Sequence, residues 1–117
     1  MPKPAPQLTQ MTLANTRTLE MVKFYDTLFD TQLQATEAYG TTLYNGTLAG
    51  IPLVICPNEI AGVIAEQSRH QLTLRVTGLA ALLELVETNG GKIETPNVTT
   101  SAILRDPDGN TLELIEA

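Results

Sequence analysis

The chain has 117 residues, of which 43% are hydrophobic and 17% are charged, so it can bury an apolar core as one domain. Seven Lys and Arg against thirteen Asp and Glu give a net charge of -6. That sign opposes binding to a phosphate backbone, so we expect no nucleic-acid partner. One Cys and one His in the whole chain exclude an internal disulfide and the Cys/His zinc patterns.

We expect neither a membrane-spanning segment nor an export signal. No stretch approaches the roughly 20 apolar residues that span a bilayer, so we expect no membrane partner. The opening residues 1–6 are interrupted by three prolines and are followed by no apolar signal core. A cytoplasmic location is therefore predicted.

The first half of the chain predicts a strand, a helix and three further strands. Residues 8–14 alternate in polarity, with Met11 and Leu13 on the packed side. The apolar positions up to residue 29 then recur at helical spacing, and Thr16 or Thr18 can cap this helix. Runs suited to strands follow at 32–37, 41–45 and 50–56, with Tyr39-Gly40 and Asn45-Gly46 as turn residues.

The second half repeats this order after a predicted linker at 58–69, in which residues 59–65 could form a turn of helix. A strand is predicted at 71–76, and a helix from Leu79 ends at Asn89-Gly90-Gly91. Strands are predicted at 92–94, 101–106 and 111–116, the last two joined by a turn at 107–110. The chain is therefore expected to be a single α+β domain, 1–117, with βαβββ modules at about 8–57 and 70–117.

The letters of the two modules also match. Gln10-Met11-Thr12-Leu13 and Gln71-Leu72-Thr73-Leu74 share the form Gln-apolar-Thr-Leu, 61 positions apart. Because the strand and helix order repeats with these letters, the pattern indicates an internal duplication.

Two segments resemble a known family. Residues 24–29 (FYDTLF) and 105–116 (RDPDGNTLELIE) are similar to the vicinal oxygen chelate superfamily, which groups glyoxalase I, bleomycin resistance proteins and extradiol dioxygenases. The resemblance implies two βαβββ modules that form a curled mixed sheet around an open cup. It also implies a homodimer that completes this cavity.

The resemblance further implies that metal ligands, where a member uses a metal, come from the first and fourth strands of each module. Those positions hold Gln10, Gln71 and Glu113 here, with Leu53 or Ile55 as the fourth, and residues 46–57 contain no carboxylate. Two neutral amides and one carboxylate make a poor divalent site. We therefore expect no metal and no cofactor.

His70 and Cys56 are reactive residue types, but neither is interpreted as a functional residue. His70 precedes Gln71, and adjacent strand residues face opposite ways, so His70 is interpreted as a histidine near a strand start rather than as a ligand. Cys56 lies in an apolar run with no basic neighbour in sequence, so it is interpreted as an inert core thiol.

The polar sides of the predicted strands supply the candidate binding residues, which are Gln10, Thr12, Gln71, Thr73, Arg75 and Glu113. These side chains could simply meet solvent, as one side of an antiparallel sheet often does. In a curled sheet they would line the cup instead. Arg75 and Glu113 would then be partly desolvated and able to pair with each other or with a ligand.

Three functions remain open. The first is a metal-free protein that binds a small organic molecule, for which the acidic balance favours a cationic guest. The absence of Trp and the few aromatic residues argue against planar drugs. The second is a glyoxalase-like lyase or isomerase that uses Glu113 as general base or metal ligand. The third is a non-catalytic interaction module.

Overall fold

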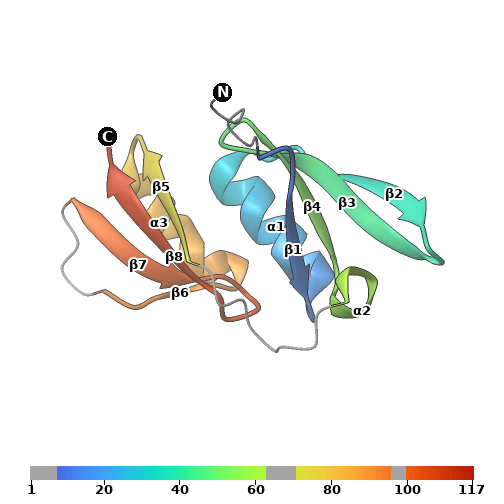
Figure 1. Cartoon of the computed structure of the whole chain (residues 1–117). Helices are drawn as coiled ribbons and strands as arrows, with labels where there is room; N and C mark the ends of the chain where they lie inside the picture. Colours follow the sequence, from blue (N-terminus) through green and yellow to red (C-terminus); the bar gives the residue numbers. More distant parts are fainter. Residues whose placement is uncertain (1–7, 63–70, 96–99) are drawn as a thin grey trace, which may run out of the picture.

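The computed structural model describes residues 8–62, 71–95 and 100–117, and it contains two βαβββ modules (Figure 1). The first module comprises β1 (Met11–Asn15), α1 (Thr18–Phe29), β2 (Gln34–Ala38), β3 (Thr41–Leu48) and β4 (Ile51–Pro57). The short helix α2 (Asn58–Ala61) follows. The second module comprises β5 (Leu72–Val76), α3 (Leu79–Val86), the 3₁₀ turn η1 (Glu87–Asn89), β6 (Lys92–Ile93), β7 (Ser101–Arg105) and β8 (Thr111–Glu116). The α+β class and the repeated order are confirmed.

Each module forms its own mixed four-stranded sheet. The strand orders are β1-β4-β3-β2 and β5-β8-β7-β6, and the first pair of each sheet is parallel. The register is the same in both parallel pairs, because Thr12 lies opposite Val54 and Thr73 lies opposite Glu113. We call the sheet of the first module the first sheet and the sheet of the second module the second sheet. Each has an edge strand, β1 or β5, at the corresponding position.

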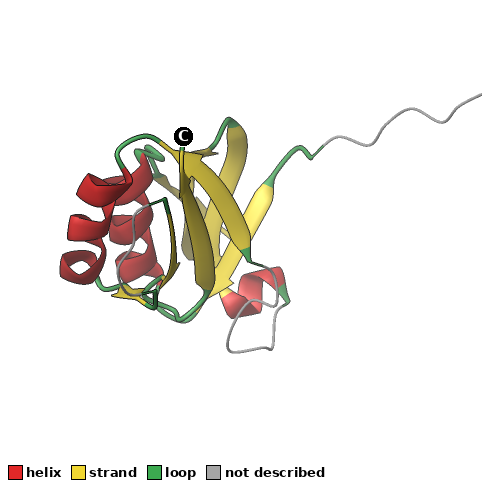
Figure 2. Cartoon of the chain, turned by 90° about the vertical axis from the view of Figure 1, so that its left-hand side faces the viewer, coloured by secondary structure: helices red, strands yellow, loops and turns green. Residues whose placement is uncertain are grey.

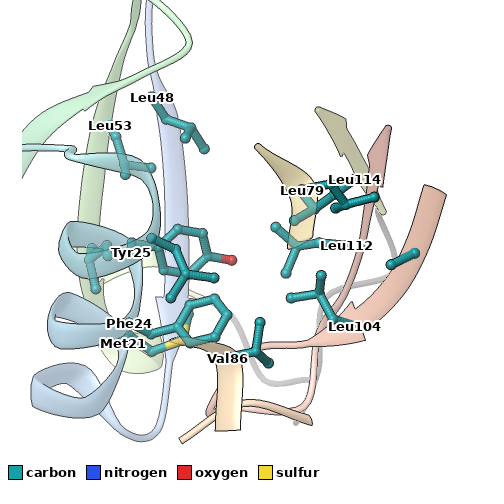
Figure 3. Close-up of a cluster of buried hydrophobic side chains, with 13 residues drawn as sticks. Met21, Phe24, Tyr25, Leu48, Leu53, Leu79, Val86, Leu104, Leu112 and Leu114 are labelled. Atoms are coloured by element: carbon teal, nitrogen blue, oxygen red, sulfur yellow. The ribbon is translucent and has the colours of Figure 1, made fainter. Parts of the chain in front are cut away.

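The predicted alternation of strand faces is confirmed, and one apolar cluster takes side chains from both modules. Its buried members are Met21, Phe24, Tyr25, Leu28, Leu48, Leu53, Ile55, Leu79, Val86, Ala102, Leu104, Leu112 and Leu114. Figure 3 shows Phe24 and Tyr25 of α1 between the first sheet and Leu104 and Leu112 of the second. Helices α1 and α3 lie together on one side of the sheets (Figure 2), so the opposite sheet faces are not covered by them.

The N-terminus of α1 is not capped by either predicted threonine. Asn15, buried at the end of β1, accepts hydrogen bonds through Oδ1 from the Arg17 backbone N–H and the Thr18 hydroxyl, both at 3.0 Å. The hydroxyl of Thr16 donates instead to Asp108 Oδ1 at 2.6 Å, across the two modules. Capping by Thr16 or Thr18 was therefore wrong, because an amide at the strand end reaches the first helical turn.

Helix α3 is capped by a residue from its neighbouring strand. The carboxylate of Glu116, the last residue of β8, accepts hydrogen bonds from the backbone N–H groups of Gly78 and Leu79 at 3.0 and 3.1 Å. A negative charge at a helix N-terminus also interacts favourably with the helix dipole. This contact fixes the start of α3 against the second sheet.

The predicted turn at Asn45-Gly46 was also wrong. Both residues lie within β3, and the chain reverses instead at Ala49 and Gly50, where φ is positive. Gly46 is needed for another reason: a Cβ there would lie 2.2 Å from the Thr31 carbonyl oxygen. That carbonyl accepts a hydrogen bond from the Thr47 N–H at 2.9 Å. The glycine therefore permits a close backbone approach inside a strand.

A buried polar contact joins the modules. The Tyr25 hydroxyl in α1 donates to Asp106 Oδ2 at 2.9 Å, and both residues are almost fully buried. The Asp106 carboxylate also accepts the backbone N–H groups of Asp108 and Asn110 at 2.9 and 3.0 Å. Burial raises the pKa of Asp106, although these hydrogen bonds oppose the shift. Burial, and then the nearby Asp106 carboxylate, raise the pKa of Tyr25, so its hydroxyl remains a donor.

Close packing at the same junction depends on Gly91. A Cβ there would lie 2.5 Å from Phe24 Cε2 and 2.6 Å from the Arg105 carbonyl oxygen. The preceding Gly90 has a φ of 91° and ends η1, which confirms the predicted left-handed C-cap. Gly90 therefore ends η1, and Gly91 leaves space for the Phe24 ring of α1.

The segment between the modules is only partly described. Helix α2 occupies the start of the predicted linker, in agreement with a turn of helix near this point. The rest of the linker, 63–70, lies outside the described residues, and so does the prediction for His70. In the part of the chain that is described, no helix has the length and apolar character needed to cross a bilayer.

We predict that Tyr25→Phe destabilises the protein by about 2 kcal/mol, because the buried Asp106 carboxylate loses a hydrogen-bond donor. The measurement is urea unfolding followed by circular dichroism. Tyr44→Phe is the matched control, because Tyr44 is half-buried and its hydroxyl makes no hydrogen bond within the described residues. The same loss of stability in both variants would contradict a specific role for the Tyr25 contact.

Candidate functional site

Four polar side chains lie together on the polar face of the second sheet: three predicted site residues and Thr111. The Thr73 hydroxyl on β5 donates to Glu113 Oε1 on β8 at 3.2 Å. The Gln71 side-chain amide donates to the Thr111 hydroxyl at 3.0 Å. These cross-strand pairs follow from the register in which Thr73 faces Glu113. The β5–β8 pair therefore presents a row of hydroxyl, amide and carboxylate groups.

Arg75 lies further along β5 on the same face and remains exposed. The only ion pair among the described residues joins Arg105 and Glu94, at 2.8 Å between Nε and Oε1. Arg75 and Glu113 therefore do not pair with each other, one of the two possibilities that the sequence left open. The Arg75 guanidinium makes no hydrogen bond to a described residue.

Apolar side chains share this face with the charges. Ile103 on β7 is 38% exposed and lies opposite Glu113, while Ile115 on β8 lies opposite Arg75 and Ser101. The face of the second sheet is thus mixed, with two isoleucines beside the unpaired Arg75 and Glu113. Neither isoleucine was among the predicted site residues, although the alternation of β7 and β8 places both on this face.

The polar face of the first sheet has a different composition. The Gln10 amide donates to the Thr12 hydroxyl at 3.1 Å, and the Asn45 amide donates to the Thr36 hydroxyl at 3.1 Å. Strand registers place the following residues on this face: Thr12, Ala14, Gln34, Thr36, Ala38, Thr41, Leu43, Asn45, Thr47, Pro52, Val54 and Cys56. None of them is charged, so the strands contribute only neutral hydrogen-bonding and apolar groups to this face.

The module-one position that matches Glu113 was assigned incorrectly. Leu53 and Ile55 are fully buried in the apolar cluster and therefore lie on the opposite face of β4. Val54 pairs with Thr12 as Glu113 pairs with Thr73, so Val54 occupies the matching position. The consequence for chemistry is unchanged, because valine has no donor atom for a metal.

A divalent cation does not fit this donor set. Gln10 and Gln71 contribute neutral amides, Glu113 contributes one carboxylate, and Val54 contributes nothing. No group of three or more His, Cys, Asp or Glu side chains able to hold a metal occurs within the described residues. Hard divalent ions need several oxygen ligands with more negative charge than this. The donor chemistry of these residues therefore does not favour a divalent-metal site.

Cys56 is buried, but not in the apolar cluster. Cys56 is 2% exposed, which confirms the predicted buried thiol, and because its strand neighbour Ile55 belongs to the apolar cluster, Cys56 is directed to the other face of β4. Figure 2 shows a short helix, α2, on the side of the sheets away from α1 and α3, next to this end of β4. Burial, and then the Glu59 carboxylate of α2, raise the pKa of the Cys56 thiol. The thiol is therefore protonated at neutral pH and a poor nucleophile.

The predicted site residues of the two modules do not meet within one chain. Gln10 and Thr12 belong to the first sheet, and Gln71, Thr73, Arg75 and Glu113 belong to the second. The two sheets share no strand, because β1 pairs with β4 and β5 pairs with β8. Within one chain, the two groups of predicted residues therefore lie on two separate sheets.

Comparison with known proteins gives the fold. No protein-family model matches the sequence, and no curated protein is similar enough to be matched. Among solved structures, a glyoxalase-related enzyme from Fulvimarina pelagi is 17% identical with a TM-score of 0.72, covering 97% of this chain and 89% of that chain. The fosfomycin resistance protein FosX from Mesorhizobium loti is 18% identical with a TM-score of 0.70, covering 96% and 92%.

An antibiotic binding protein from a Streptomyces species is similar over the same extent. It is 16% identical with a TM-score of 0.64, and the match covers 97% of this chain and 98% of that chain. These likenesses span nearly the whole of each chain at low sequence identity. The chain therefore has the fold shared by glyoxalase-related, fosfomycin resistance and antibiotic-binding proteins.

We predict that the purified protein contains no stoichiometric metal and gains no thermal stability from added Mn²⁺, Ni²⁺ or Zn²⁺, because one carboxylate and two amides bind such ions weakly. The measurements are elemental analysis and thermal unfolding with and without each ion. One ion per subunit, lost together with stability in Glu113→Ala, would contradict the prediction.

Proposed function

We propose that this chain is a member of the vicinal oxygen chelate superfamily that binds a small organic molecule without a metal ion. The observation that carries the proposal is the pair of polar sheet faces, one neutral and one charged, left uncovered by α1 and α3. Glu113 is half-buried, and only one of its carboxylate oxygens accepts a hydrogen bond from a described residue. Its second oxygen is available to a guest.

The binding cavity is proposed to form in a homodimer, between the first sheet of one copy and the second sheet of the other. The support is that α1 and α3 lie together on one side of the sheets, against their apolar faces, and leave the polar faces open (Figure 2). Among the described residues, β1 and β5 are sheet edges, as are β2 and β6, and such edges favour pairing with another chain. A twofold dimer would produce two equivalent cavities.

The second candidate is a glyoxalase-like lyase or isomerase in which Glu113 acts as the general base. Its support is the free Glu113 oxygen and the likeness to a glyoxalase-related enzyme. Arg75 is the only other charged residue next to Glu113 across the β5–β8 pair, and its guanidinium would have to stabilise the oxyanion that proton removal creates. Simple binding requires no such stabilisation, so it ranks first. A non-catalytic interaction module needs no occupied cavity.

We predict that native mass spectrometry of the purified protein detects a homodimer that retains a small organic molecule and no metal. Glu113→Ala should remain dimeric and lose the molecule, because the carboxylate contacts the guest. Glu84→Ala is the matched control, since Glu84 is an exposed carboxylate on α3, away from both polar faces.

A monomer with no retained molecule would contradict the proposal and favour the interaction module. Conversion of the retained molecule by the wild type, abolished in Glu113→Ala, would move the lyase or isomerase to first place.

A further inference from the structure

Arg75 and Glu113 carry opposite charges on adjacent strands but are not paired. Arg75 lies opposite Ile115, and Glu113 lies opposite Thr73, so the two charged residues are diagonal neighbours on one face of the β5–β8 pair. Diagonal neighbours have Cβ atoms roughly 7 Å apart, within reach of long side chains. On the same face, Arg105 and Glu94 do form an ion pair at 2.8 Å. The separation of Arg75 from Glu113 leaves room for a bridging group.

Closing the cavity makes this arrangement costly unless a guest supplies charge. Under the proposed function, the second sheet is covered by the first sheet of another copy, and the strand residues on that face are uncharged. No strand residue of the covering face can therefore neutralise Arg75 or Glu113. A charge buried without a partner is strongly destabilising. A guest with one charge would satisfy one of these residues and leave the other unpaired.

We infer, on the basis of that proposed function, that the guest is a zwitterion whose carboxylate binds Arg75 and whose ammonium group binds Glu113. A guanidinium offers a planar fork that matches a carboxylate. The free Glu113 oxygen is a suitable acceptor for an ammonium group. A zwitterion carries no net charge, so the chain's charge of -6 does not repel it as it would an anion.

The uncharged part of the guest is expected to be small and aliphatic. Ile103 and Ile115 flank the two charges, and Val54 and Leu43 lie on the face that would cover them. No aromatic side chain lies on either polar face among the described strands. The chemical class is therefore an aliphatic α-amino acid or a compound with the same paired groups. This inference replaces the cationic guest that the overall acidity of the sequence suggested.

The test is titration of the ¹⁵N-labelled full-length protein, followed by NMR, with three probes of the same carbon skeleton. L-leucine carries both charges, L-leucinamide carries only the cation, and 4-methylpentanoate carries only the anion. We expect leucine to shift the signals of β5, β7 and β8, and each singly charged probe to bind at least about tenfold more weakly. Arg75→Gln should abolish the preference for leucine over leucinamide, because the two probes differ in the carboxylate. Glu113→Gln should abolish the preference for leucine over 4-methylpentanoate, because these two differ in the ammonium group. Lys23→Gln, an exposed change on α1, should preserve both preferences.

Two results would overturn the inference. Equal affinity for leucine and either singly charged probe would show that one charge is recognised alone. No shift of β5, β7 or β8 with leucine would show that the face does not accept paired charges of this kind. Neither result would contradict the proposed function, because that stands or falls on the molecule retained in native mass spectrometry.

Discussion

The packing of α1 against both modules is the interaction on which the rest of the structure depends. Met21, Phe24 and Tyr25 are fully buried there, and burial of each such side chain contributes about 1.5–3 kcal/mol. The apolar faces of both sheets are buried in the apolar cluster. Their polar faces therefore lie on the side away from α1 and α3, and under the proposed function a second chain closes the cavity. The Tyr25 to Asp106 hydrogen bond then fixes how the second module sits on the helix.

Divergence between two copies of one motif explains the character of the site. The equivalent registers of Thr12 with Val54 and Thr73 with Glu113 show that the modules still present matching positions. The first module holds a valine where the second holds a carboxylate. A site with carboxylates in both modules could hold a metal ion, whereas this pair yields one neutral wall and one charged wall. Under the proposed function, the recognition of a guest then depends on Arg75 and Glu113.

Local patterns predicted most of the fold, because strand alternation and helix periodicity are short-range properties. Apart from the cap of α1, where Asn15 binds groups two and three positions away, the failures involve contacts between distant segments. Gly46 was read as a turn residue because the passing Thr31 carbonyl is not apparent from sequence. Val54 was missed because face assignment in β4 depends on its register with β1. The Tyr25 and Asp106 pair spans 81 positions, and no local signal joins a helix tyrosine to a turn aspartate.

The central claim is that the cavity forms between the first sheet of one copy and the second sheet of another. Its most direct test is the double variant Thr12→Cys/Thr73→Cys, treated with a short bis-maleimide and weighed under denaturing conditions. Both positions are exposed in the single chain, and the buried Cys56 has a raised thiol pKa and should not compete. The account predicts a covalent dimer as the main product. A product of monomer mass with both cysteines bridged, or no bridging at all, would contradict it.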